Sequence, residues 1–159
     1  EKWPPYGHYI LLVLMFVGGC AGSTGGAIKC VRVWLLLKIA ANQIFRIIHP
    51  KAVRATWYNG RIVPPDVAQG VQSMFVLYML TFVGSSAALA WLGNDVLTSI
   101  SAIAATLGNV GPGLGTVGPV ENYSHFTLAS KWVCSFAMLV GRLEVYSVVV
   151  LFVPEFWRK

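Results

Sequence analysis

The sequence predicts an all-α polytopic membrane protein, and three observations lead to that fold class. Hydrophobic residues make up 56% of the 159 residues, only 11% are charged, and the mean hydropathy is +0.65. Several runs without charge approach or exceed the length of about 20 residues that a helix needs to cross a bilayer. The cations lie between these runs rather than in a patch interleaved with aromatic residues. The composition therefore argues against a soluble globular domain and, despite a net charge of +6, against nucleic-acid binding.

The first apolar run, residues 9–28, is just long enough to span the bilayer, but its second half is unusual. Residues 9–17 favour a helix, whereas the next ten residues contain five glycines. Each interior glycine costs about 0.5–1 kcal/mol relative to alanine, so together they disfavour a continuous helix. A rival interpretation is equally open from the residues alone, because Gly18, Gly22 and Gly26 have the GxxxG spacing of closely packed helices.

Two further spans follow. Residues 67–94 carry no charge and are bounded by Asp66 and Asp95, and the run 126–153 is long enough to cross although it contains charged residues. Between these spans, residues 96–107 have helical character, but at 1.5 Å per residue they reach only about 18 Å and cannot cross. The sequence thus predicts three crossings and one short re-entrant segment.

The distribution of cations sets the orientation, because Lys and Arg in short loops stay on the cytoplasmic side. The connection between the first two spans holds cations and no acidic residue: Lys29, Arg32, Lys38, Arg46, Lys51, Arg54 and Arg61. Residues 67–130 contain no Lys or Arg, so the connection to the last span is external. Arg158 and Lys159 then return the C-terminus to the cytoplasm.

The cytoplasmic connection, residues 39–65, contains one strong local signal. Asn59-Gly60 tolerates the positive φ angles of a tight turn and lies between two short runs of β-forming residues. We therefore expect a small β-hairpin there. Residues 39–48 are compatible with a helix on the membrane surface or with a plain linker, and the pattern does not choose between them.

The half-helix of residues 95–107 runs directly into residues 108–115, Gly-Asn-Val-Gly-Pro-Gly-Leu-Gly, which are too rich in glycine and proline to be helical. Non-helical backbone at membrane depth persists only where protein or a water-filled cavity satisfies its polar groups. Glycine allows successive carbonyl oxygens to face one axis, where a ring of them can replace the hydration shell of a potassium ion. The partly negative C-terminal end of the half-helix also favours a cation. A spanning helix, a half-helix, a filter loop and a second spanning helix form the repeating unit of potassium-channel pores; an external Gly/Pro loop is the alternative.

Three motifs, at residues 106–115, 18–29 and 141–144, together resemble the membrane subunit of Trk-type and Ktr-type potassium uptake systems. The resemblance covers essentially the whole chain. That superfamily folds four successive repeats of helix, pore helix and helix around one pore. The resemblance implies that residues 1–38 correspond to the second, broken helix of the third repeat and residues 66–159 to the fourth repeat. The first two repeats and the third filter are absent.

The resemblance also implies which residues act. The filter would bind potassium through the backbone carbonyls of Asn109, Val110, Gly111 and Pro112, with Gly111 as the key glycine. An intramembrane loop would form the gate, which favours the interrupted helix over the GxxxG interpretation. The gate residues are Gly18, Gly19, Cys20, Ala21, Gly22, Ser23, Thr24, Gly25 and Gly26. Ala27 departs from the family's usual run of three glycines and would stiffen that end of the loop.

Arg142 lies near the middle of the last predicted span, where an arginine that faces lipid costs at least about 2.5–3.5 kcal/mol. We therefore expect Arg142 to face the protein interior and, as part of the gate, to donate hydrogen bonds to carbonyls of the broken helix. A weak repeat, with three identical positions of five between residues 15–19 and 138–142, predicts a similar depth for the two segments. Glu144 lies on a different helical face and is no obvious partner. A purely structural arginine is the alternative.

No enzyme chemistry is predicted. The spans contain no cluster of His, Asp or Cys, and Cys20, Cys30 and Cys134 form no CxxC pair. The glycine-rich residues 18–26 lack the lysine of a phosphate loop. We expect no cofactor, and potassium is the transported substrate.

The sequence therefore predicts potassium transport across the bacterial inner membrane by a channel-like subunit. The resemblance implies a homodimer in the lipid bilayer and a cytosolic, nucleotide-binding regulatory ring, with no nucleic-acid partner. Because the sequence begins at Glu1 without a leader, we expect a piece of a longer protein. Two alternatives stay open: a sodium-permeable or sodium-coupled relative of the same superfamily, and a non-conducting truncated or assembly fragment.

Overall fold

A computed structural model describes residues 4–23, 25–52, 55–151 and 153–158 of the chain. The helices are α1 (Pro5–Leu14), α2 (Cys30–Ile48), α3 (Pro65–Trp91), α4 (Val96–Leu107), α5 (Leu128–Leu143), α6 (Val145–Leu151) and α7 (Pro154–Trp157). Two short strands, β1 (Trp57–Tyr58) and β2 (Arg61–Ile62), form a hairpin. Two 3-10 turns, η1 (Gly115–Val117) and η2 (Tyr123–His125), lie between α4 and α5. The helical fold that the sequence predicts is confirmed.

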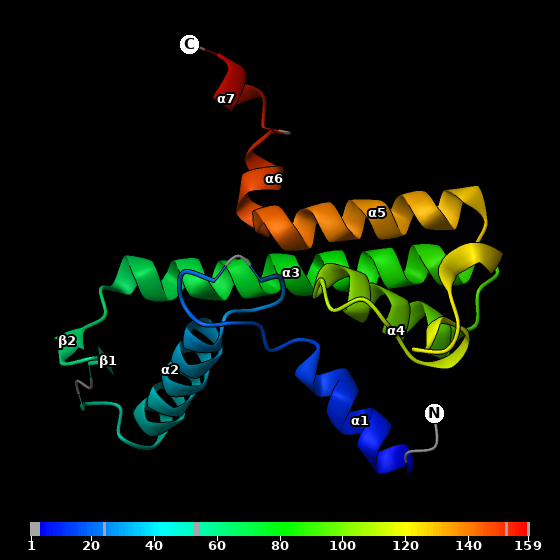
Figure 1. The fold of residues 1–159 in the computed structure, drawn as a ribbon. Helices are drawn as coiled ribbons and strands as arrows, with labels where there is room; N and C mark the ends of the chain where they lie inside the picture. The colour runs from blue at the N-terminus through cyan, green and yellow to red at the C-terminus, as the bar shows by residue number, and fades with distance from the viewer. Residues whose placement is uncertain (1–3, 24, 53–54, 152, 159) are drawn as a thin grey trace.

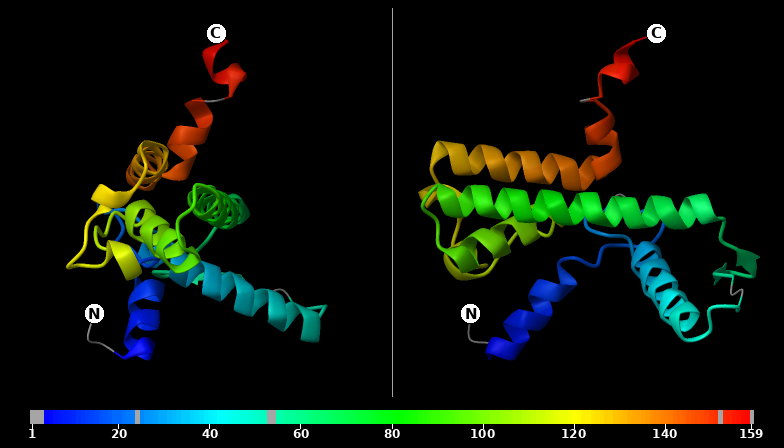
Figure 2. Two further views of the ribbon diagram at one scale, coloured as in Figure 1. Left: turned by 90° about the vertical axis from the view of Figure 1, so that its right-hand side faces the viewer. Right: turned by 180° about the vertical axis from the view of Figure 1, so that it is seen from behind.

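Three helices pack together as the body of the fold (Figure 1). The longest helix is α3, α5 runs alongside it, and α4 lies against both, so that each of the three contacts the other two. The helices α1 and α2 project from the side of α3 that faces away from α5. At the other end of the chain, α6 and α7 lead the C-terminus away from the body (Figure 2).

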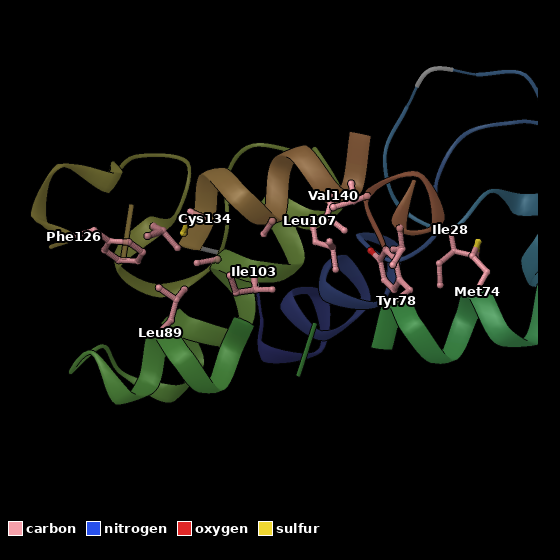
Figure 3. Close-up of a cluster of buried hydrophobic side chains, with 14 residues drawn as sticks. Ile28, Met74, Tyr78, Leu89, Ile103, Leu107, Phe126, Cys134 and Val140 are labelled. Carbon is pink, nitrogen blue, oxygen red and sulfur yellow. The ribbon is translucent and has the colours of Figure 1, made fainter. Parts of the chain in front are cut away.

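The core of this body is centred on α4, which is buried over most of its length. Its sequence carries no charge, and its four hydroxyl residues, Thr98, Ser99, Ser101 and Thr106, are buried together with most of its apolar residues. Leu89 of α3 and Ile103 and Leu107 of α4 are fully buried, and they form one cluster with Ala137 and Val140 of α5 (Figure 3). The C-terminal end of α4 is therefore fixed between α3 and α5.

The second predicted span, residues 67–94, corresponds to α3. This helix begins at Pro65, because the fixed φ of proline suits the first turn of a helix. It ends before Gly93, whose φ of +91° is incompatible with a continuing helix. Within the described residues, α3 is the one unbroken helix that is long and apolar enough to cross a membrane.

The short segment predicted at residues 95–107 is the helix α4. Asp95 is its cap rather than its first residue, because its carboxylate accepts hydrogen bonds from the backbone N–H groups of Leu97 and Thr98 at 3.1 and 3.5 Å. With 12 residues, α4 is too short to cross a bilayer, as the sequence predicts.

The spanning helix predicted over residues 126–153 is not continuous. Its two parts, α5 and α6, are bent by 110° about Glu144. Glu144 has φ +63° and ψ +140°, far from the values of about −63° and −42° that a helix requires. The bend carries no glycine or proline of its own, so no local signal marks it; tertiary contacts, described below, hold it.

Helix α2 also differs from the prediction, because it runs without interruption across the boundary predicted between the broken helix, which ends at residue 38, and the cytoplasmic connection, which begins at residue 39. No glycine or proline occurs from Cys30 to His49, so nothing in the backbone stops the helix. Residues 39–48 are therefore helical, which excludes the plain linker, but they continue an upstream helix instead of forming a separate one.

The hairpin predicted around Asn59-Gly60 is confirmed. The strands β1 and β2 pair antiparallel, with Tyr58 opposite Arg61. Both turn residues have positive φ, +46° and +76°, as a two-residue turn requires. The side chain of Lys38 donates a 2.7 Å hydrogen bond to the backbone of β1, which holds the hairpin against α2.

Candidate functional site

The glycine segment, residues 18–27, joins α1 to α2 and contains no helix among its described residues. Its two ends lie side by side: the Gly18 N–H donates to the Ile28 carbonyl at 2.8 Å, and the Ile28 N–H donates to the Phe16 carbonyl at 3.1 Å. A side chain at Gly18 would collide with the Gly26 carbonyl oxygen, so this close approach requires glycine. The predicted interruption of the first span is confirmed, and a continuous helix with GxxxG packing is excluded.

The base and the tip of the glycine segment differ. The base is closed by the backbone hydrogen bonds given above, and Gly19 there accepts a further one from the Cys30 N–H at 3.2 Å. The exposed tip consists of Cys20, Ala21, Gly22, Ser23 and Gly25, while Thr24, a predicted gate residue, lies outside the described residues. At the tip, Ser23 Oγ accepts a hydrogen bond from the Gly25 N–H at 3.1 Å. The segment is thus a loop with a fixed base and an exposed tip.

The 108–115 segment turns back along α4 instead of continuing it. Asn109 and Gly111 have positive φ, +54° and +115°, which redirects the chain. The buried hydroxyl of Ser101 in α4 then donates to the Leu114 carbonyl at 2.8 Å, so the returning strand is tied to the helix that precedes it. Between these two points, the four residues predicted to bind potassium are exposed in this chain: Asn109, Val110, Gly111 and Pro112.

A cavity of about 650 Å³ separates the 108–115 segment from α1. Its lining includes Val110 and Pro112 of that segment, Leu11 of α1 and Met15, which caps α1. The lining is mainly apolar, apart from backbone groups and His8 at the start of α1. Two of the four predicted filter residues, Val110 and Pro112, therefore border an open space in this chain.

Three glycines bring the glycine segment, the 108–115 segment and α5 into direct contact. A Cβ atom on Gly26 would lie only 2.6 Å from the Gly108 carbonyl oxygen and 2.7 Å from Asn109 Nδ2. One on Gly141 would collide with the Leu107 carbonyl oxygen. We call this contact, made by Gly26, Gly108 and Gly141, the glycine junction. The structure therefore brings the end of the predicted gate loop against the start of the predicted filter.

Met15 and Met138, the first residues of the weak internal repeat, take similar places at the glycine junction. The Met15 carbonyl oxygen lies 2.7 Å from where a Cβ atom on Gly108 would stand. The Met138 carbonyl oxygen accepts a hydrogen bond from Asn109 Nδ2 at 3.3 Å. Backbone carbonyls of both helices thus contact adjacent residues at the start of the 108–115 segment, which agrees with the similar depth that the repeat predicts.

Arg142 does not make the hydrogen bonds to the broken helix that the sequence predicts. Arg142 is exposed, and its side chain makes no hydrogen bond or ion pair within the part of the chain that the structure describes. Carbonyls at the base of the glycine segment have other partners, since Gly18 and Gly19 accept hydrogen bonds from Cys30. The preceding residue, Gly141, lines the same small cavity as Gly25 of the glycine segment. Arg142 is therefore next in sequence to a residue that lies near the glycine segment, but its side chain makes no hydrogen bond to that segment.

Glu144 is the charged residue that sequence reasoning missed. Its carboxylate accepts hydrogen bonds from Lys29 Nζ at 2.7 Å and Arg32 Nη2 at 2.8 Å, and the three side chains are 23–35% exposed. Lys29 and Arg32 lie three positions apart at the start of α2, directly after the glycine segment, so they share one helical face. An acid within an apolar span needs a cationic partner, which is the signal that could have found this contact.

Groups of three or more His, Cys, Asp or Glu that could hold a metal ion are not found in the described residues. All three cysteines are free thiols; Cys20 and Cys30 are exposed and Cys134 is buried.

Known proteins resemble the chain over its whole length. The model of the TrkH family, described as a cation transport protein, matches residues 1–159. The Trk system potassium uptake protein TrkH of Halomonas elongata is 43% identical over 159 residues, which cover all of this chain and 33% of the relative. The protein of the same name from Escherichia coli K12 is 39% identical over 158 residues, covering 99% of this chain and 32% of the relative.

Among solved structures, the crystal structure of the potassium transporter TrkH from Vibrio parahaemolyticus matches with a TM-score of 0.89 and 40% identity. The match covers 98% of this chain and 33% of that chain. This likeness confirms the all-α polytopic membrane fold, and the chain spans about a third of the length of the relatives it matches. Because the family model matches from the first residue to the last, the chain belongs to the TrkH family of cation transport proteins.

Proposed function

We propose that this chain is part of a channel-like membrane subunit that takes up potassium across the bacterial inner membrane. The observation that carries the proposal is the end of α4, where a buried and capped half-helix leads into exposed, non-helical backbone. Backbone of this kind at membrane depth is what a carbonyl-lined filter requires. The relatives are named potassium uptake proteins and a potassium transporter, which supports potassium as the ion.

In this proposal the filter binds potassium through backbone carbonyls of Asn109, Val110, Gly111 and Pro112. These carbonyls replace water around the ion, and the partial negative charge at the C-terminal end of α4 stabilises it. Filters from the rest of a longer subunit complete the ring. Transport of this kind forms no covalent bond, so the subunit is not an enzyme and needs no cofactor.

The glycine segment, together with Arg142, is the gate in this proposal. The glycine junction supports that role, because a displacement of Gly26 would press directly on Gly108 and Asn109. Arg142 follows Gly141 of the same junction, and a positive charge beneath the filter would repel potassium while the pore is closed. The gate therefore combines a physical obstruction with an electrostatic one.

We also propose how the chain fits into the whole subunit. Residues 1–38 would complete the third repeat of the pore, residues 66–159 would form the fourth, and residues 39–65 would lie in the cytoplasm. The family resemblance supports a homodimer with a cytosolic, nucleotide-binding regulatory ring and a cytoplasmic C-terminus. The hairpin, with exposed Arg61 in β2, would meet that ring.

Gly111→Ser tests the filter in a full-length subunit that carries these residues, expressed in bacteria that lack their own potassium uptake. The φ of Gly111, +115°, is a conformation that a side chain strains, so the substitution displaces the carbonyls of the filter. We expect sodium to inhibit potassium uptake by the variant at concentrations that do not affect the parent.

The matched control is Gly84→Ser, because Gly84 is exposed on α3 and a Cβ atom there meets open space. Both variants must reach the membrane in equal amounts. If the preference for potassium over sodium is the same in Gly111→Ser and in the parent, residues 109–112 are not the filter.

A further inference from the structure

Tyr123, a residue that the sequence does not single out, contacts the key glycine of the proposed filter. It lies in η2, on the chain that returns from the 108–115 segment to α5, and its hydroxyl donates a 3.0 Å hydrogen bond to the Gly111 carbonyl oxygen. We infer that Tyr123 is a positioning residue that fixes the Gly111–Pro112 peptide and thereby sets the ion preference of the filter. The inference rests on the proposed function and adds to it a residue outside the filter itself.

The orientation of the peptide between Gly111 and Pro112 depends mainly on the backbone of Gly111, because the ring of Pro112 fixes the φ angle on its other side. Gly111 has φ +115°, and as a glycine it has no side chain that restrains its own backbone. Pro112 supplies no N–H, so hydrogen bonding can hold this peptide plane only through its carbonyl oxygen. In the described structure, Tyr123 is the residue that makes that bond.

The tyrosine itself is well anchored. Its ring is half-buried and meets the ring of Phe126 edge to face, with 5.4 Å between the ring centroids. Phe126 is 4% exposed and belongs to the core cluster, so the anchor reaches into the body of the fold. The Tyr123 hydroxyl is protonated, and therefore a donor, at physiological pH, and burial raises its pKa further, to about 12.

Tyr123 completes a set of three contacts on the 108–115 segment. Asn109 Nδ2 donates to the Met138 carbonyl of α5 at the start of the segment, and Ser101 of α4 donates to the Leu114 carbonyl near its end. Tyr123 donates its hydrogen bond to Gly111, in the middle of the segment. Since a carbonyl oxygen has two lone pairs, Gly111 can accept the tyrosine hydrogen bond and still offer the other lone pair to a cation.

The test is Tyr123→Phe in a full-length subunit, because this change removes the hydroxyl and keeps the ring against Phe126. Potassium uptake is measured over a range of potassium concentrations, with and without sodium as competitor. We expect the apparent KM for potassium to rise, and the sodium concentration for half inhibition to fall, by about five- to tenfold, the effect of one lost hydrogen bond of ordinary strength. The maximal rate should change by less than about twofold, because the ring and the fold are kept.

Tyr9→Phe is the matched control, since Tyr9 is 64% exposed on α1 and its hydroxyl has no hydrogen-bond partner among the described residues. A second readout needs no transport: the purified parent should melt at a higher temperature in potassium than in sodium, and Tyr123→Phe should reduce that difference. A general loss of stability would lower both melting temperatures equally, which would overturn the inference.

Gly111→Ser, measured in parallel, separates the two levels of the proposal. If Gly111→Ser alters the ion preference while Tyr123→Phe leaves the KM, the sodium inhibition and the melting difference unchanged, the filter stands and the role of Tyr123 is refuted. If neither substitution alters the ion preference, the filter assignment itself is refuted, and the role of Tyr123 with it.

Discussion

Among the described residues, the helical path is broken between α1 and α2 and again between α5 and α6, for different reasons. Between α1 and α2 the break includes the glycine segment, residues 18–27, where glycines make a continuous helix costly. Between α5 and α6 the break is a single residue, Glu144, with a positive φ of +63°. The first break is favoured by composition, whereas the second is held by the two hydrogen-bonded ion pairs that Glu144 makes.

The two breaks are also joined to each other. Glu144 binds Lys29 and Arg32, which lie directly after the glycine segment at the start of α2. A movement of α2 would therefore act both on the base of the glycine segment and on the bend between α5 and α6. The first break thus forms a loop, and the ion pairs at the second break connect the end of that loop to α5 and α6.

The largest effect on stability is expected at a glycine that allows two backbone segments to approach closely. Gly141 lies in α5 just before the second break, and a Cβ atom there would collide with the Leu107 carbonyl oxygen. Gly141→Ala should lower the free energy of unfolding by about 3 kcal/mol or more, because neither backbone can move easily within the core. Thermal unfolding of the purified subunit measures this.

Gly84→Ala is the control for that prediction. Gly84 lies within α3 with open space around it, so alanine should be neutral or stabilise by up to about 1 kcal/mol. If the two alanine variants are equally stable, α5 and the end of α4 do not pack so closely that only glycine fits at position 141.

At the second break, the side-chain charge of Glu144 and its backbone conformation should each affect the free energy of unfolding, and two substitutions separate these effects. Glu144→Ala removes both ion pairs and should cost about 1–3 kcal/mol, since the three side chains are only partly exposed. Glu144→Gly removes the same contacts but relieves the positive φ, which is itself worth about 1–3 kcal/mol.

We therefore expect Glu144→Gly to be clearly more stable than Glu144→Ala in thermal unfolding. The order would be reversed at an ordinary helical position, where glycine is the less stable residue. Finding that reversed order would mean that the helix straightens in the variants and that the bend is not imposed on this residue by its surroundings.

Sequence reasoning could find features whose cause is local. Asn59-Gly60 predicts the hairpin, because a two-residue turn depends only on residues within a few positions. The partners of Glu144 are 115 and 112 positions away, so no local pattern contains them. The bend at Glu144 therefore could not be predicted from the sequence, whereas the interruption after α1 could.

The charged and polar contacts of the candidate site show the same limit. The expected bonds from Arg142 assumed that carbonyls at the first break lack partners, whereas the chain itself supplies Cys30 as a donor. Tyr123 reaches Gly111 only because the chain after α4 returns along it. Composition and spacing indicate where a site lies, but the choice of partners depends on the tertiary structure.

The smallest effect is expected within the first break. Ala27 has φ +59°, a conformation that costs a non-glycine residue roughly 1–2 kcal/mol. Ala27→Gly relieves this strain, but the greater conformational entropy of the unfolded chain offsets about 0.5–1 kcal/mol of that gain, so the net stabilisation should stay below about 1.5 kcal/mol. A marked loss of stability on thermal unfolding would contradict this prediction, because it would mean that the methyl group makes an essential contact.

Potassium flux into liposomes that contain the full-length subunit tests most directly whether the glycine segment is the gate. Deleting residues 21–24 removes most of the exposed tip and keeps the hydrogen-bonded base, and Arg142→Ala removes the charge beside the loop. We predict that both variants conduct more potassium than the parent and depend less on the regulatory ring. Variants that fold and dimerise normally but keep the flux and the regulation of the parent would show that the loop and the arginine are structural.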